Sequence, residues 1–307
     1  MSNSTSLLKE YVKALVQNID RQTLPKKVDL VFSGGAFNGF LAMGVAMYVL
    51  ELQKQGLIEI GRISGCSIGS VVALWSLADD KCDVDEWYSD MVKCFRTNHN
   101  LVKFHDIVRC AVEKFFPEND DMSRVNGRLF VNFHDLKKKK KKVVSKYRNR
   151  EHLIECILRS GHVPHVIDGN IRYKGRYSDG LSPYIFNETP GVEVMFIEIV
   201  TFNKLYHFIP RRAEINPQSR LLIGVTDANE FFTRGNSDMC SYVSQWSPFR
   251  KASLYGRDIL YMFVHAIIEL FVGLHACVPD RITDSIVYSG ICNILKELCS
   301  EAANRAL

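Results

Sequence analysis

The sequence predicts an α/β protein with a largely parallel central sheet and helices on both of its faces. Two similar units support this prediction, each a short apolar strand that runs into a glycine-rich turn and then a helix. Residues 28–32 lead into Ser33-Gly34-Gly35, and residues 63–64 lead into Gly65-Cys66-Ser67-Ile68-Gly69. Such repeated units are typical of three-layer α/β/α domains. Both glycine turns then fall at the carboxyl ends of strands, where ligands bind in these sheets.

The rest of the chain is assigned from its hydrophobic periodicity. Apolar residues at helical spacing predict helices over residues 8–19, 40–55, 71–77, 83–116 and 151–159. Residues 163–179 are expected to form short extended segments with turns, and residues 192–201 a strand. From about residue 221 onward the pattern is mostly helical. With 307 residues, 47% of them hydrophobic, the chain is long enough for one large α/β domain with a full core.

The charge of the chain is modest. A formal net charge of +5 permits attraction to an anionic membrane, but it is too small to indicate nucleic-acid binding. Residues 137–142 are six consecutive lysines, for which we expect a solvated, mobile loop. The alternative is contact with lipid phosphates, worth about 1 kcal/mol per lysine at an anionic bilayer.

The cysteines and the apolar segments indicate location. Nine cysteines without CxxC or zinc-like spacing predict no structural metal and fit a reducing, cytoplasmic compartment, and no secretory segment begins the chain. Residues 259–278 are apolar over a membrane-spanning length but are interrupted by His265, Glu269 and His275. Because buried charge is costly in a bilayer, we expect a buried or membrane-facing helix here.

Ser67 is the candidate nucleophile, at the centre of a Gly-x-Ser-x-Gly pattern between a strand and a helix. A nucleophile elbow needs a sharp turn that strains the serine backbone, and glycines two residues away on each side prevent clashes. The alternative is an ordinary strand–helix turn in which the serine caps the helix. The pattern alone does not decide between the two.

The earlier turn, from Gly34 to Gly39, is a candidate anion-binding loop. It lacks the Gly-Lys-Ser/Thr of a P-loop and the spacing of a dinucleotide fingerprint. Its amides are suited instead to an oxyanion hole, in which each donor contributes typically about 3 kcal/mol. The serine turn at the next strand favours this second interpretation.

A nucleophilic serine needs a base. None of the histidines stands in an evident strand-end loop near the end of the chain, and the nearest fit, His275, lies in an apolar helix. Two Asp-Gly pairs are the other candidates. Asp168-Gly169 has the pattern of a hairpin turn, and Asp179-Gly180 is either a turn or a functional acid.

Taken together, these motifs resemble the patatin-like phospholipase family. The glycine-rich loop, the helix, the Gly-x-Ser-x-Gly turn and a distant Asp-Gly occur in the family's order. The approach to Asp179 is similar too, with Ser160, Pro164 and then residues 175–180. The resemblance covers residues 28–183 well and the C-terminal helical part poorly.

The resemblance implies a serine–aspartate dyad without histidine or metal. Ser67 is then the nucleophile and Asp179 its base, and the amides of Gly34, Gly35 and Ala36 form the oxyanion hole. The supporting glycines of these motifs are Gly39, Gly65, Gly69 and Gly180. No cofactor is implied. Residues 1–26 form an N-terminal helix, 27–210 the patatin-like catalytic domain, and 211–307 a helical part packed on the same domain.

Three positions depart from the family's pattern. Ala36 stands where a third glycine is usual, Asn38 replaces a basic residue, and Leu181 follows Asp179-Gly180 where a small residue is common. None of the three removes a catalytic group.

The implied activity is a lipid acyl hydrolase of the phospholipase A or acylglycerol lipase type, working through an acyl-enzyme. The expected substrate is a phospholipid or acylglycerol at a membrane or lipid-droplet surface, to which a cytoplasmic protein attaches peripherally. Nucleic acid is not an expected partner. The alternatives are a catalytically weak lipid- or membrane-binding module, a glycerolipid transacylase, and a hydrolase with a histidine triad.

Overall fold

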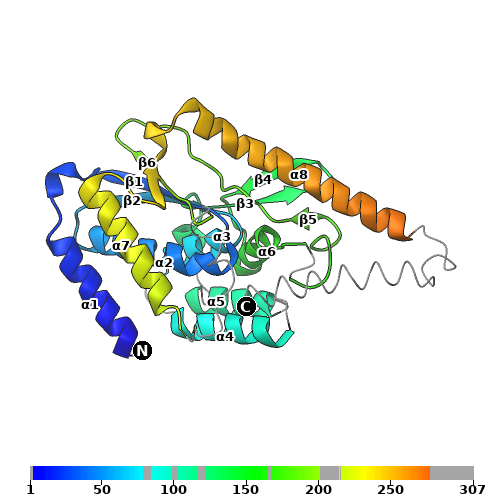
Figure 1. The fold of residues 1–307 in the computed structure, drawn as a ribbon, viewed down its shortest axis with the longest axis horizontal. Coiled ribbons are helices and arrows are strands. Elements are labelled where there is room, and N and C mark those ends of the chain that lie inside the picture. The colour runs from blue at the N-terminus through cyan, green and yellow to red at the C-terminus, as the bar shows by residue number, and fades with distance from the viewer. Residues whose placement is uncertain are drawn as a thin grey trace.

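The computed structural model describes residues 3–78, 84–98, 103–116, 122–164, 167–200, 214 and 216–276. In these residues a mixed sheet forms the centre of the molecule and helices pack around it (Figure 1). The strands run in the order β4-β3-β2-β1-β6-β7, and the short strand β5 also pairs with β3.

The middle of the sheet is parallel and its edges are antiparallel. The parallel strands are β1 (Lys27–Phe32), β2 (Glu59–Gly65), β3 (Leu129–Asp135) and β6 (Glu193–Ile197). The antiparallel partners are β4 (Lys140–Val144), β5 (Tyr177–Ser178) and β7 (Cys240–Tyr242). The prediction of an α/β fold with a largely parallel central sheet is therefore confirmed.

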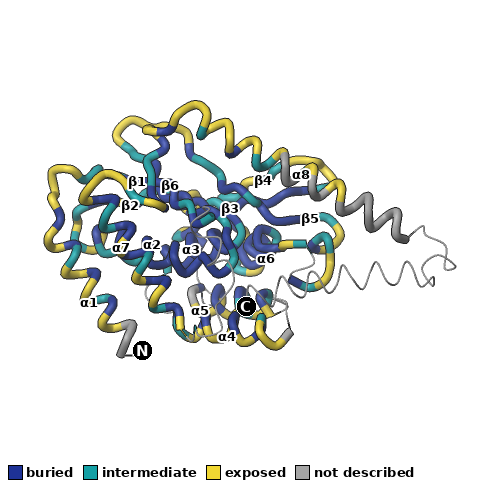
Figure 2. Tube along the Cα trace, in the orientation of Figure 1, coloured by how far each residue is buried: buried dark blue, intermediate teal, exposed yellow. Residues whose placement is uncertain are grey.

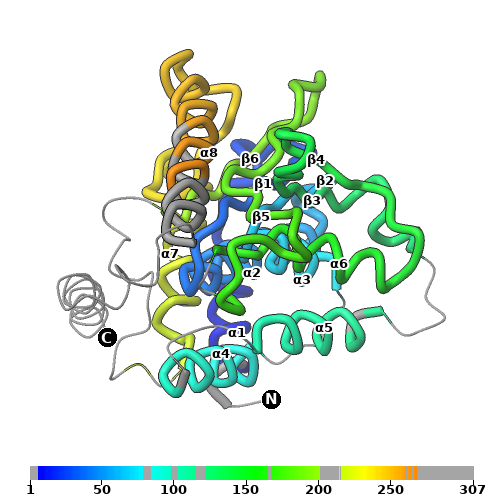
Figure 3. Tube along the Cα trace, turned by 90° about the vertical axis from the view of Figure 1, so that its right-hand side faces the viewer, coloured from blue at the N-terminus to red at the C-terminus, as the bar shows by residue number. Residues whose placement is uncertain are grey.

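Most helices of the described chain surround one face of the sheet. They are α1 (Asn3–Gln17), α2 (Gly39–Lys54), α3 (Ile68–Trp75), α4 (Val84–Asn98), α5 (Phe104–Phe115), α6 (Arg150–Ser160) and α7 (Gln218–Arg234). The long helix α8 (Pro248–Ala276) lies on the side of the sheet away from α4 and α5 (Figure 3).

The sheet divides the apolar residues into a large and a small core. On β1, Leu30 and Phe32 join the large core with α2 and α3, while Val31 points to the other face. There it meets Phe196 and Trp246 and a few neighbours. Figure 2 shows the same contrast, with α2 and α3 almost wholly buried.

Helices α2 and α7 cross at a distance that only glycine allows. A Cβ at Gly44 would lie 2.1 Å from the Leu221 carbonyl oxygen, and one at Gly224 would lie 2.0 Å from that of Leu41. This contact joins the C-terminal part of the chain to the same core as the central sheet. Residues 36–54, which include α2, are long and apolar enough to cross a membrane, but 72% of that stretch is buried inside the protein, as in a core helix.

Three strands were not foreseen from the sequence. β3 was not predicted at all, and β7 occurs in a part predicted to be mostly helical. The six lysines were expected to form a solvated loop. This holds for residues 137–139, which make an exposed turn, and is wrong for residues 140–142, which belong to β4 and pair with β3. Lysine is common on edge strands because its charge prevents further strands from adding. The domain boundaries stay a prediction.

Candidate active site

Ser67 lies in a strained turn between β2 and α3. Its backbone has φ 52° and ψ −134°, a conformation that costs a non-glycine residue about 1–3 kcal/mol. Both flanking glycines are required by close approach, since a Cβ at Gly65 would lie 2.2 Å from the Gly69 carbonyl oxygen and one at Gly69 would lie 2.5 Å from that of Ser33. The Ser67 side chain makes no capping hydrogen bond to α3. The geometry is that of an elbow, and the helix-cap alternative is wrong.

Two other serines hold the elbow in place. The Ser67 amide donates a 2.9 Å hydrogen bond to the Ser160 hydroxyl, and that hydroxyl donates 2.7 Å to the Asn132 carbonyl oxygen. The Ser70 hydroxyl donates 2.6 Å to the Ser67 carbonyl oxygen. The polar groups on both sides of Ser67 are thereby fixed by α6, β3 and α3.

Asp179 follows β5, and β3 positions it. The buried amide nitrogen of Asn132 donates to the carbonyl oxygens of Gly180 (3.1 Å) and Ser182 (2.8 Å). A Cβ at Gly180 would lie 2.3 Å from the Asn132 carbonyl oxygen, so glycine is needed at this contact. The other Asp-Gly pair, Asp168-Gly169, has a local role: the Asp168 carboxylate accepts a hydrogen bond from the Asn170 amide within a turn.

The Asp179 carboxyl is buried and faces the Ser67 hydroxyl. Burial raises its pKa to about 6, and the nearby Ser67 hydroxyl, the Leu181 amide and the charge of Lys141 oppose that rise. Oδ1 accepts a 2.7 Å hydrogen bond from the Leu181 amide. Among the described residues Oδ2 has no hydrogen-bond partner, although the Ser67 hydroxyl lies close enough to the carboxyl to lower its pKa. Catalytic hydrogen bonds are often loose before substrate binds.

His134, also on β3, supports Asp179 through the backbone. Its Nδ1 lies 2.8 Å from the Asp179 carbonyl oxygen, which only accepts, so Nδ1 carries the proton. Burial lowers the pKa of His134, which keeps the ring neutral. Among the described residues, no histidine bonds to the Ser67 hydroxyl. The described histidines therefore give the histidine-triad alternative no support, and the side chain of His275 lies outside the part of the chain that the structure describes.

The loop from Gly34 to Gly39 lies against the elbow. A Cβ at Gly34 would lie 3.0 Å from that of Ser67, so the two turns are in contact. The Gly34 amide lies against the Cys66 thiol. The amides of Gly35 and Ala36 have no acceptor in the part of the chain that the structure describes. These two amides are therefore available to bind an oxyanion.

The three departures from the family's pattern have visible structural effects. Ala36 and Leu181 adopt left-handed backbone angles, with φ 46° and φ 52°, which cost a side-chain-bearing residue about 1–2 kcal/mol each. Asn38 is fully buried and donates 2.7 Å to the Ile199 carbonyl oxygen. Its own oxygen accepts from the buried guanidinium of Arg220 at 3.5 Å, so a basic group from α7 reaches the position that lacks one.

Sequence reasoning missed Asn132 and His134. Both belong to β3, which was not predicted, and they alternate with Val131 and Phe133 in the run Leu-Phe-Val-Asn-Phe-His-Asp. Polar residues two apart in an otherwise apolar strand share one face. That spacing is the signal from which they were identifiable.

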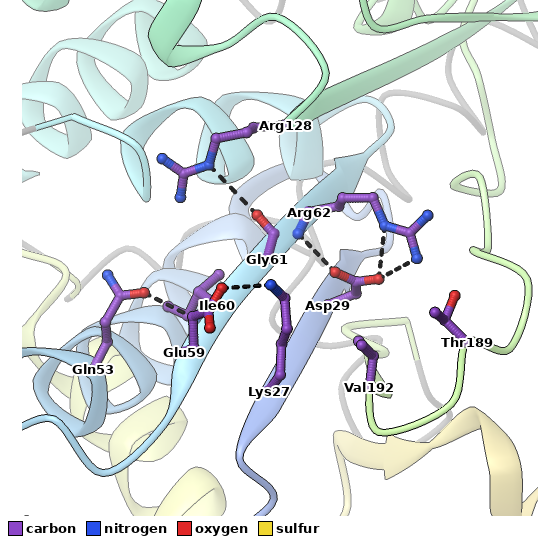
Figure 4. A pocket seen from close by; sticks show the side chains of 10 residues that line it. All are labelled: Lys27, Asp29, Gln53, Glu59, Ile60, Gly61, Arg62, Arg128, Thr189 and Val192. Atoms are coloured by element: carbon purple, nitrogen blue, oxygen red, sulfur yellow. Dashed lines mark hydrogen bonds and ion pairs between the residues drawn. The ribbon is translucent and has the colours of Figure 1, made fainter.

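A groove at the opposite end of the sheet is unsuited to catalysis. Four of its charges are paired: Lys27 pairs with Glu59, and the Arg62 guanidinium binds Asp29 through two nitrogens, at 2.8 and 2.5 Å (Figure 4). Arg128, which also lines the groove, donates to the Gly61 carbonyl oxygen. Its lining contains no serine, cysteine or histidine. In the described residues, no group of three or more His, Cys, Asp or Glu side chains is placed to hold a metal ion.

Comparison with known proteins adds little. No protein-family model matches the chain, and no curated protein sequence matches it. Among solved structures, the crystal structure of VipD from Legionella pneumophila aligns at 14% identity and a TM-score of 0.30. The alignment covers 55% of this chain and 49% of VipD, so the chain spans about half of that structure's length. A similarity this low carries no argument about function.

Proposed function

We propose that this protein is a serine ester hydrolase of the patatin-like type, with Ser67 as nucleophile and Asp179 as base. One observation carries the proposal: a buried carboxyl with a pKa of about 6 and an unpartnered Oδ2 faces a serine held in a strained elbow. A structural aspartate in a folded protein normally has all its oxygens bonded. The incomplete bonding here is typical of a group that acts on a proton.

In the proposed reaction, Asp179 Oδ2 takes the Ser67 hydroxyl proton while Oγ attacks the ester carbonyl carbon. The amides of Gly35 and Ala36 donate hydrogen bonds to the oxyanion of the tetrahedral intermediate. Gly34, which has no side chain, allows their loop to lie against the Ser67 turn. The leaving alcohol receives the proton from Asp179, and an acyl group remains on Ser67. Asp179 then takes a proton from a water molecule as the water oxygen attacks the acyl carbonyl carbon. It returns that proton to Ser67 Oγ as the bond between Oγ and the acyl group breaks, which releases the fatty acid and restores the serine. Since its pKa is about 6, this carboxyl is ionised at pH 7–8 and is a stronger base than an ordinary aspartate.

Fatty-acyl esters of phospholipids or acylglycerols are the substrates we propose. The support is the resemblance of the motifs from Gly34 to Asp179 to patatin-like phospholipases, together with a long helix that exposes large apolar side chains. A protein that acts on lipids works at a membrane or droplet surface, so we also propose peripheral membrane attachment from the cytoplasmic side.

Two alternatives differ from hydrolysis in the outcome they predict. A glycerolipid transacylase uses the same Ser67 acyl-enzyme but passes the acyl group to an alcohol. A catalytically weak lipid-binding module has no need for Ser67 or Asp179. The strain at Ser67 favours an enzyme, because a binding module gains nothing from it.

The test is release of fatty acid from mixed phospholipid vesicles by wild type, Ser67→Ala and Asp179→Asn. Asp168→Asn is the matched control, because it changes the carboxylate of the other Asp-Gly pair, which accepts a hydrogen bond within a local turn. We expect activity in wild type and Asp168→Asn, and a loss of at least about 1,000-fold in the other two variants. Activity that survives Asp179→Asn contradicts the dyad. Acyl transfer to added monoacylglycerol in place of hydrolysis supports the transacylase.

A further inference from the structure

Helix α8 exposes a continuous apolar face. Tyr255, Ile259, Phe263 and Ile267 follow one another four residues apart and are 73, 71, 63 and 46% exposed. Side chains four residues apart lie on one face of a helix. Exposed Ala252, Gly256 and Ala266 fall on the same face. No described residue covers this face, which runs along the outer side of the molecule (Figure 1).

The opposite face of α8 attaches the helix to the body of the protein, mainly through charges. Arg250 and Arg257 donate to Glu198, which follows β6, at 3.3 and 2.8 Å. Asp258 pairs with Lys141 of β4 at 3.0 Å, and Leu254 joins the small core. An ordinary surface helix has the reverse arrangement, with its apolar side inward. The outward apolar face of α8 is therefore available for an interaction.

The neighbouring hairpin contributes positive charge. Residues 137–140 are four exposed lysines, three in the turn between β3 and β4 and one at the start of β4, and none of them forms an ion pair with another described residue. The Lys141–Asp258 ion pair ties this hairpin directly to α8. An apolar helix face beside unpaired lysines is complementary to a membrane whose headgroups are anionic and whose interior is apolar.

We propose that the apolar face of α8 and the lysines at 137–140 together form a docking surface for an anionic phospholipid bilayer. The inference deepens the proposed function, on which it rests, by identifying the part of the molecule that meets the lipid. The Lys141–Asp258 ion pair links this surface to the candidate site, because the charge of Lys141 also acts on the Asp179 carboxyl.

The experiment is flotation with vesicles of phosphatidylcholine alone and of phosphatidylcholine mixed with phosphatidylserine. All proteins carry Ser67→Ala, so that the vesicles stay intact and binding is measured without catalysis. The test variant is Ile259→Asp with Phe263→Asp, and a second variant is Lys138→Gln with Lys139→Gln. A control is Leu7→Asp, which places one negative charge on an equally exposed apolar position of α1. Thermal unfolding checks that each variant is folded.

We expect the parent protein to float with the phosphatidylserine vesicles. Binding should weaken at least about tenfold in the α8 variant and in the lysine variant, and it should be unchanged by Leu7→Asp. Raised salt should weaken binding of the parent more than that of the lysine variant. Unchanged binding by the α8 variant overturns the proposal. The proposal is also overturned if the parent protein is a dimer, the α8 substitutions dissociate that dimer, and flotation is unchanged. The apolar face of α8 then binds a second copy of the chain.

Failure of the docking proposal and failure of the proposed function are distinguishable. Hydrolysis of a water-soluble ester is measured separately in the protein with its native Ser67. Flotation that depends on α8 without any ester hydrolysis refutes the proposed function and supports the docking surface. Ester hydrolysis together with flotation that does not depend on α8 supports the proposed function and refutes the docking surface.

Discussion

The amide of Ser67 donates its hydrogen bond to the hydroxyl of Ser160, at 2.9 Å, and Ser160 in turn donates to the Asn132 carbonyl oxygen. The end of α6 and the middle of β3 therefore hold the backbone at the turn between β2 and α3. Because Ser67 has a left-handed backbone conformation that is unfavourable in isolation, surrounding contacts have to maintain it. Ser160 is thus a positioning residue for the proposed nucleophile.

Replacing Ser160 with alanine should lower activity by about ten- to a hundredfold and stability by about 1–2 kcal/mol. The Ser67 amide loses its acceptor, and the elbow becomes less well defined. Ser76→Ala is the matched control, since this buried hydroxyl donates within a helix to the Val72 carbonyl oxygen, away from the elbow. Measured kcat should fall for Ser160→Ala only. Equal kcat losses in the two variants would indicate a general packing effect.

The pH dependence of the reaction should follow Asp179. Its pKa is about 6, so the carboxylate that accepts the Ser67 proton disappears as the pH falls through that value. We expect kcat/KM on a water-soluble ester to fall about tenfold for each pH unit below about 6. Lys141 lowers the pKa of Asp179, so Lys141→Met should move this limb to higher pH. A limb that stays in place in Lys141→Met would contradict the assignment of this pKa to Asp179.

Asp179→Asn should be more stable than wild type at neutral pH. Burial raises the pKa of Asp179 from 3.8 to about 6, so the folded state favours the protonated carboxyl. That stabilisation is complete below about pH 4 and is lost as the pH rises through about 6. An uncharged amide avoids the loss, and we expect a gain of about 2–3 kcal/mol at pH 8.

The measurement is urea unfolding of both proteins at pH 8 and pH 4. The difference between them should be large at pH 8 and small at pH 4. A variant that is less stable than wild type at pH 8 would show that the carboxylate has partners that compensate for its burial.

The contact between α2 and α7 should tolerate no side chain. In Gly224→Ala, the new methyl group would lie 2.0 Å from the Leu41 carbonyl oxygen, which forces the helices apart. We expect a loss of about 2–4 kcal/mol in the free energy of unfolding. Gly256→Ala in α8 is the control, because a Cβ there meets nothing within 4 Å and should stabilise the helix by up to about 1 kcal/mol. Similar losses at both positions would contradict this account of the packing.

The sequence by itself determined the class of fold and the order of the motifs. Residues 28–32 and 63–64 are short strand segments that run into glycine-rich turns, and this pattern depends only on local chemistry. The same is true of the helices around residues 40–55 and 151–159. Ser67 and Asp179 were identifiable because each stands in a short local motif.

Only the tertiary structure decided what surrounds those two residues. Ser67 and Asp179 are 112 positions apart (179 − 67), and β3 brings them together through Asn132 and His134. The run of six lysines also does not reveal that residues 140–144 pair with β3 as the second strand of a hairpin. The raised pKa of Asp179 likewise arises from burial by the folded chain. The outward orientation of the apolar face of α8 depends on the ion pairs that the other side of the helix forms. The partners in those ion pairs come from β4 and from the residue after β6.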